Sequence, residues 1–274
     1  MAATSGSRGS LRALVLKLAL VFGASAGVTL SLCLLLLQRV RDHDAEGSGQ
    51  QRDGGDGGGD DPTASSLDQL SLRSFSSLAE LQRSHATFSH IFAVEFPLAL
   101  LCFACIYTMK QTFAIPGSAV LNLFAGAILP LYVAFPLVAV LTAIGASNCY
   151  LLSRFLASEE IVSGVCVKFL PGKLPQLRAQ IDKAREEGEL MYMLLFLRVF
   201  PFSPNWFLNL VSPWLQVPLY LFTPSVLLGL LPYNFITSTS DMLDPKTIAS
   251  LVLLALGMLV PAILKKKSQK KKEN

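Results

Sequence analysis

The segment from Phe196 to Leu215 reads FLRVFPFSPNWFLNLVSPWL. It is apolar enough to lie in a membrane, yet it contains one arginine, two asparagines, three prolines and two serines. Prolines interrupt a helix, and an interrupted helix at membrane depth leaves backbone N–H and C=O groups unpaired. Such groups are tolerated there only where protein buries them or where they line a cavity. We therefore expect two half-helices beside a polar region that includes Arg198.

A second segment, residues 115–126, repeats the pattern with the sequence IPGSAVLNLFAG. Each segment has a helix-breaking proline beside a small or polar residue, then an aliphatic run and an Asn-Leu pair, which begins at Asn122 in the first and at Asn209 in the second. Short apolar segments that are broken by Gly or Pro at matching places in two halves are typical of a transport site. Chance similarity between two apolar segments is the alternative.

The composition of the whole chain is that of a membrane protein. Of its 274 residues, 52% are hydrophobic and 15% are charged, whereas charged residues make up roughly 25% of an average soluble domain. No basic stripe interleaved with aromatic residues lies outside the apolar regions, so we expect no nucleic-acid partner. Complete spans are expected at 18–37, 88–109, 131–156, 217–237 and 247–264, with 112–130 re-entrant and 190–215 broken into two half-helices.

The chain is expected to divide into four parts. Basic residues before the first span place the N-terminus in the cytosol, and a Gly/Asp-rich spacer at 42–66 is expected to be disordered. An amphipathic helix is expected at 67–86 and a surface helix within 157–189. The parts are the N-terminus with a signal-anchor helix (1–37), the spacer with the amphipathic segment (38–87), the membrane domain (88–264) and a basic cytosolic tail (265–274).

One acid and one base lie deep in the apolar segments. Glu95 stands within the expected 88–109 span, where an acid is costly and should face protein or water. Arg198 is able to snorkel, to meet water in a polar cavity or to contact a lipid phosphate, and Glu95 is its obvious partner to test. The alternative is that Arg198 anchors the helix near the membrane interface.

Five motifs resemble those of the transmembrane protein 41 family, closest to its A-type member, within the DedA superfamily whose shared region is the VTT domain. The resemblance covers about residues 88–267. The motifs are KQTFAIPGS, LNLFAGAILP, IGASNCYLLS, FLRVFPFSPNWFLNLVSP and GLLPYNFI.

The resemblance implies an all-α polytopic membrane fold of about six transmembrane helices, with two re-entrant half-helix segments in an inverted repeat facing a polar cavity. It implies residence in the endoplasmic reticulum and ATP-independent phospholipid scrambling, with a role in lipid mobilisation and autophagosome formation. The family's motif residues fall on Arg198, Pro204, Asn205 and Trp206, and on Pro116, Gly117 and Ser118. With Asn122, Asn209 and Glu95 they form the predicted lipid path.

Other functions stay open at this point. A proton- or ion-coupled transporter would use Glu95 and Arg198, and a contact-site or trafficking organiser would use the tail and residues 157–189. The sequence contains no HExxH or GxxxxGK[ST] motif, so we expect no enzyme activity, no cofactor and no metal site.

The C-terminus ends in Lys271-Lys272-Glu273-Asn274. Lysines at the third and fourth positions from the end match a di-lysine retrieval signal, which coat proteins read from the cytosol. With both termini cytosolic, an even number of crossings is needed, and the broken 190–215 segment is expected to supply the sixth. The expected partners are therefore membrane phospholipids and coat proteins.

Overall fold

The computed structural model describes residues 3–51, 85–158, 162–164, 174–199 and 204–239. Every regular element in these ranges is a helix, as the sequence predicts. The last predicted span, the amphipathic segment up to residue 84 and the di-lysine tail lie outside the described residues.

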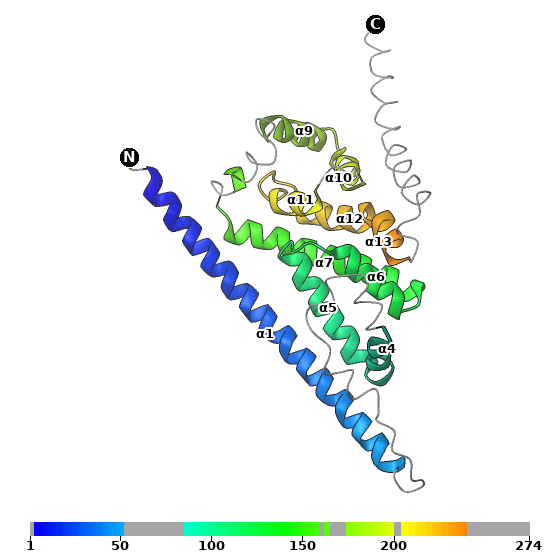
Figure 1. The fold of residues 1–274 in the computed structure, drawn as a ribbon. Helices are drawn as coiled ribbons and strands as arrows, with labels where there is room; N and C mark the ends of the chain where they lie inside the picture. The colour runs from blue at the N-terminus through cyan, green and yellow to red at the C-terminus, as the bar shows by residue number, and fades with distance from the viewer. Residues whose placement is uncertain (1–2, 52–84, 159–161, 165–173, 200–203, 240–274) are drawn as a thin grey trace, which may run out of the picture.

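The first helix, α1 (Ala3–Gln51), runs alongside the rest of the molecule as one long rod (Figure 1). Its apolar part, Ala13–Ala45, has 33 residues and a mean hydropathy of 2.3, so it is long enough to cross a membrane. The helix continues through residues 42–51, where the sequence predicts the start of a disordered spacer. A contact explains part of this extension, because Asp44 lies 3.5 Å from His90 of the neighbouring helix.

The second predicted span is bent. Helix α4 (His85–Val94) and helix α5 (Phe96–Thr112) meet at Glu95 with an angle of 120° between them. Pro97 lies in the first turn of α5, where a proline is tolerated because its missing N–H would have no partner anyway. The predicted span at 88–109 is therefore not one straight helix, and the signal for the bend was Pro97, two residues after Glu95.

A tight turn separates α5 from the short apolar helix α6 (Ser118–Ile128). Ala114 and Gly117 adopt left-handed backbone angles in this turn, with φ of 53° and 104°. Only glycine takes such angles at little cost, so Gly117 suits its position. Pro130 ends the segment, and α7 (Leu131–Leu156) follows as a full-length apolar helix.

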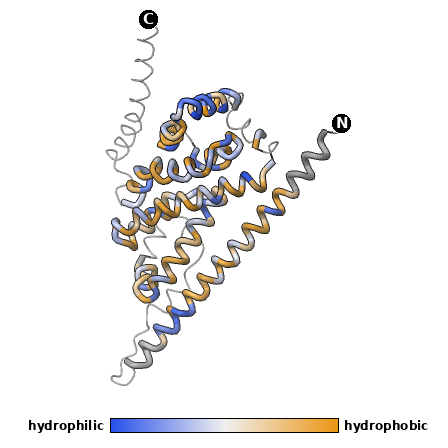
Figure 2. Tube along the Cα trace, turned by 180° about the vertical axis from the view of Figure 1, so that it is seen from behind, coloured by the Kyte–Doolittle hydropathy of each residue, from blue (hydrophilic) through white to orange (hydrophobic). Residues whose placement is uncertain are grey.

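The second half begins with α9 (Leu174–Glu186), which is the predicted surface helix and is largely hydrophilic (Figure 2). Two short helices follow on either side of residues 200–203: α10 (Leu190–Val199) and α11 (Asn205–Val211). The chain ends its described part with α12 (Leu219–Gly229) and α13 (Leu231–Ser238), which together form one candidate span of 20 residues.

Helix α7 is the centre of the body (Figure 1). Its first half packs with α5 and α6 through residues such as Ala134 and Val138, and its second half packs with α11 and α12 through residues such as Ala146 and Tyr150. Three single helices, or four spans if the bent pair α4–α5 counts as one, are long and apolar enough to cross a membrane within the described residues. The chain is thus a multi-pass membrane protein.

Candidate functional site

A cluster of five polar side chains, here called the asparagine cluster, lies inside the apolar body. Asn122 of α6 is at its centre and is fully buried, with 0% of its surface exposed. Its oxygen accepts a hydrogen bond of 2.8 Å from the Tyr107 hydroxyl of α5, and its Nδ2 donates to the Thr237 hydroxyl of α13 at 2.7 Å and to the Asn234 oxygen at 3.2 Å. Tyr107 also contacts the Thr142 hydroxyl of α7 at 2.7 Å.

The asparagine cluster joins the two halves of the chain. Asn122 belongs to the first broken segment, whereas Asn234 and Thr237 lie more than 100 residues later, on the last described helix. Gly126 permits this approach, because a Cβ at that position would overlap the Ser238 backbone carbonyl. The Asn234 amide nitrogen is buried and has no hydrogen-bond partner among the described residues. Since buried unpaired donors are costly, this atom marks a place where a polar ligand atom or water is favoured.

A second polar site, the arginine pair, is formed by Arg198 and Asn209. Arg198 lies in the last turn of α10 and is 4% exposed, and its NH1 donates a 2.7 Å hydrogen bond to Asn209 Oδ1 on α11. Its guanidinium also lies 4.7 Å from the centre of the Phe222 ring of α12, within the range of a cation–π interaction. No described carboxylate forms an ion pair with Arg198.

The two halves place equivalent residues in equivalent contacts, which supports the internal repeat. Gln111 and Arg198 each precede the asparagine of their own Asn-Leu pair by 11 residues. A Cβ on Gly145 of α7 would lie 2.5 Å from Gln111 Cβ, and a Cβ on Gly229 of α12 would lie 2.5 Å from Arg198 Cβ. In the first half, therefore, α5 packs tightly against Gly145 of α7, and in the second half α10 packs in the same way against Gly229 of α12.

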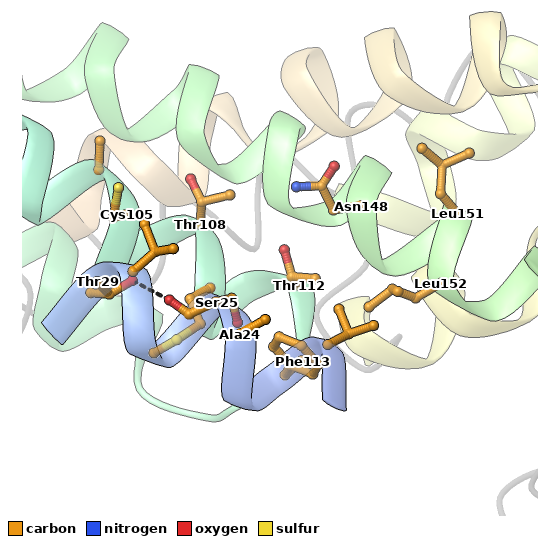
Figure 3. A pocket seen from close by; sticks show the side chains of 14 residues that line it. Ala24, Ser25, Thr29, Cys105, Thr108, Thr112, Phe113, Asn148, Leu151 and Leu152 are labelled. Carbon is orange, nitrogen blue, oxygen red and sulfur yellow. Dashed lines mark hydrogen bonds between the residues drawn. The ribbon is translucent and has the colours of Figure 1, made fainter. Parts of the chain in front are cut away.

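A groove opens between α1, α5 and α7, with a volume of about 660 Å³ (Figure 3). Its walls are mainly apolar, but hydroxyl and amide side chains from all three helices lie along it. The half-buried Asn148 of α7 lines it together with Thr108 and Thr112 of α5. On α1, the groove-lining Thr29 bonds to the Ser25 carbonyl. A lengthwise row of polar groups between apolar helices is what a headgroup needs if its tails are to stay in lipid.

The structure brings some predicted path residues together and separates others. Asn122 lies in the asparagine cluster, and Arg198 and Asn209 form the arginine pair. Glu95 lies at the α4–α5 bend and makes no ion pair with Arg198 within the described part of the chain, so the predicted partnership does not form here.

The remaining predicted residues lie at the starts of the two short helices. Pro116 and Gly117 are in the exposed turn before α6, and Ser118 is its first residue. Pro204 precedes α11, and Trp206 is 37% exposed. Asn205 begins α11, and its buried Oδ1 has no hydrogen-bond partner among the described residues. Lys271 and Lys272 lie outside the described residues.

Comparison with known proteins matches part of this chain to a family. The family model of the VTT domain matches residues 115–240, from the turn before α6 to the end of α13. Over this segment the chain is similar to the VTT-domain family. The match covers the two broken segments and both of their asparagines.

Curated relatives confirm the resemblance to the transmembrane protein 41 family. The chain is 34% identical over 181 residues to the Transmembrane protein 41 homolog of Dictyostelium discoideum. The aligned region is 62% of this chain and 52% of that protein. It is 35% identical over 185 residues to human Transmembrane protein 41B, and the aligned region is 64% of this chain and 61% of that protein. The chain thus spans about half to two thirds of the length of these relatives. No solved structure matches it.

Sequence reasoning missed four members of the asparagine cluster. Tyr107, Thr142, Asn234 and Thr237 lie in segments that the sequence identifies only as apolar spans. Each of these polar residues could have been noticed within its apolar span, because polar residues are rare in membrane helices and face the interior of the bundle. The apolar pattern gives no indication of which of them share a cluster.

Proposed function

We propose that this protein moves phospholipids between the two leaflets of the endoplasmic reticulum membrane without ATP, and so supports lipid mobilisation and autophagosome formation. The observation that carries the proposal is the groove between α1, α5 and α7, where Thr108, Thr112 and Asn148 place polar groups along an otherwise apolar wall. A zwitterionic headgroup would follow this row while its acyl chains stay in the surrounding lipid. Weak contacts at several points favour passage over trapping.

The proposal assigns a supporting role to the asparagine cluster. Its hydrogen bonds tie α6 to α13 and so hold α5 and α7, which form two walls of the groove, in fixed positions. Hydrogen bonds between helices stabilise their association in a membrane, where the hydrophobic effect contributes little to helix–helix packing.

Arg198 and Asn209 are proposed as phosphate contacts in a more open state. In the described conformation Arg198 donates one hydrogen bond to the amide oxygen of Asn209, which a phosphate would have to replace as the acceptor. A guanidinium binds phosphate in a bidentate manner, which makes this exchange favourable once α10 and α11 separate. Pro204, Asn205 and Trp206 are proposed as part of the same opening, and Pro116, Gly117 and Ser118 as the matching part in the first half.

Purified protein in liposomes tests the proposal. A trace of fluorescent phospholipid is distributed over both leaflets, and dithionite bleaches the outer one in the absence of ATP and of any ion gradient. We expect bleaching well beyond half of the signal. Bleaching that stops near half, with correctly folded protein in every vesicle, would contradict a scramblase.

The same vesicles separate the scramblase from a proton- or ion-coupled transporter. Lipid exchange that requires a pH or sodium gradient would favour coupling. We expect lipid exchange to need no gradient. Glu95 and Arg198 lie in separate places among the described residues, so they do not form the pair that coupling would use. A contact-site organiser would give no exchange in either condition.

A further inference from the structure

Lys110 is a buried cation that neither polar site uses. It lies in the last turn of α5, only 8% of its surface is exposed, and its Nζ has no hydrogen-bond partner among the described residues. No carbonyl of the last turn of α5 accepts a hydrogen bond from this Nζ. A buried ammonium without a counter-charge is costly, and an anion that reaches it removes the cost.

The beginning of α6 offers further unpaired donors beside this lysine. The amides of Val120 and Leu121 both bond to the Gly117 carbonyl, which leaves the Ser118 and Ala119 amides without a backbone acceptor in the described structure. Gly117 precedes the helix and provides no side-chain cap. The first turn of a helix carries partial positive charge and exposes its N–H groups, so it favours an anion.

Lys110 and the start of α6 lie close together. A Cβ on Gly117 would lie 4.0 Å from Lys110 Cε, so the ammonium lies within reach of the first turn of α6. The turn above it, from Ala114 to Gly117, is exposed, which gives a ligand access from outside. The groups below it, Tyr107 and Asn122, are neutral and bonded to each other.

We infer that Lys110 Nζ and the free amides of Ser118 and Ala119 form a binding site for a phosphate group. A phosphate has enough acceptor oxygens to meet an ammonium and two amides at once, which a hydroxyl or a single carbonyl does not. The phosphate belongs to a lipid headgroup or to free inorganic phosphate, and the experiment below separates these sources. The inference deepens the proposed function and rests on it only for the choice of a lipid as the physiological ligand.

Native mass spectrometry of the full-length protein in detergent and phosphate-free buffer tests the site. The probes are dioleoyl phosphatidic acid and dioleoylglycerol, which have the same tails and differ by the phosphate. We expect the wild type to retain phosphatidic acid more than dioleoylglycerol. Lys110→Met should lower the retention of phosphatidic acid about tenfold, the effect of losing about one charge-assisted hydrogen bond. Lys110→Arg should keep it within about twofold, because the charge remains.

Lys183→Met is the matched control, since it removes one lysine from the exposed helix α9 and should change nothing. Lys110→Gln gives a second neutral variant of the site if Lys110→Met folds poorly. Added inorganic phosphate then distinguishes the sources. Displacement of phosphatidic acid would show that the site also takes free phosphate, and persistence would show that it needs the lipid; both results support the site.

Two results would overturn the inference: equal retention of the two lipids by the wild type, or unchanged retention by both neutral variants at Lys110. Neither depends on transport. If the protein scrambles lipid but changes at Lys110 do not affect binding, the proposed function holds and the proposed site is wrong. If binding depends on Lys110 but the protein scrambles no lipid, the site holds and the proposed function is wrong.

Discussion

Asn122 of α6 donates a 2.7 Å hydrogen bond to the hydroxyl of Thr237 on α13, across 115 residues of sequence. This bond and its neighbours join the first broken segment to the last described helix. In a membrane, where apolar contact alone gives little preference for one helix partner over another, such a bond fixes which helices meet. The α6–α13 contact therefore connects the two halves of the segment that matches the VTT domain.

Asn122→Ala tests this tie. The change removes the amide and leaves Tyr107, Asn234 and Thr237 with fewer partners in a buried site. We expect a loss of about 2–4 kcal/mol in unfolding free energy, since each buried group left unpaired costs about 1–3 kcal/mol. Thermal unfolding in detergent, followed by circular dichroism, measures it. Gln176→Ala on the exposed face of α9 is the amide control and should have no effect.

Gly126→Ala tests the close approach of the same helices. The added methyl group would meet the Ser238 backbone carbonyl, which no side-chain rotation relieves. We expect α6 and α13 to separate, with a lower melting temperature and less lipid exchange. Gly23→Ala on α1 is the control, because its new Cβ meets nothing within 4 Å and alanine favours a helix. Equal stability of Gly126→Ala and wild type would contradict the described contact.

A double-mutant cycle on Arg198→Leu and Asn209→Leu tests the arginine pair. Each single change leaves the other polar group buried and unpaired, whereas the double change removes both. We expect the double variant to be more stable than the sum of the single effects predicts, with a coupling of about 0.5–3 kcal/mol. Additive effects would show that the two side chains do not interact in the protein.

Lys110→Met should stabilise the protein in phosphate-free detergent. The variant replaces an unpaired buried ammonium by an apolar chain of similar length. Replacing buried charge by apolar side chains is often neutral or stabilising by about 1–4 kcal/mol. We expect a rise of a few degrees in melting temperature, and added phosphatidic acid should raise the melting temperature of the wild type and not that of the variant. A large drop would mean that the lysine has a structural partner.

The sequence predicts the broken segments well, because their signals are local. Proline and glycine mark the breaks beside α6 and α11, and the repeated Asn-Leu pair identifies Asn122 and Asn209 as buried polar residues. The charge pattern of residues 174–186 likewise predicts α9 as a surface helix, which is confirmed.

What the sequence does not predict depends on tertiary contact. Lys110 ends an apolar run and so resembles an interfacial charge, but its side chain is buried in the folded protein. The partners of Asn122 lie on three different helices, and no periodicity links them. The α1–α5–α7 groove depends on where a long first helix packs, which its own sequence leaves open.

If phospholipid headgroups cross along this groove, the loss of its polar groups should slow lipid exchange. Thr108→Val with Asn148→Leu removes two polar groups of the row at nearly constant volume, and Gln180→Leu on exposed α9 is the control. The assay uses liposomes treated with dithionite, without ATP or a gradient. We expect fast bleaching beyond half of the signal for wild type and control. For the groove variant we expect at least about tenfold slower exchange, which corresponds to about 1.4 kcal/mol at the barrier. Equal rates in a correctly folded groove variant would contradict passage along the groove.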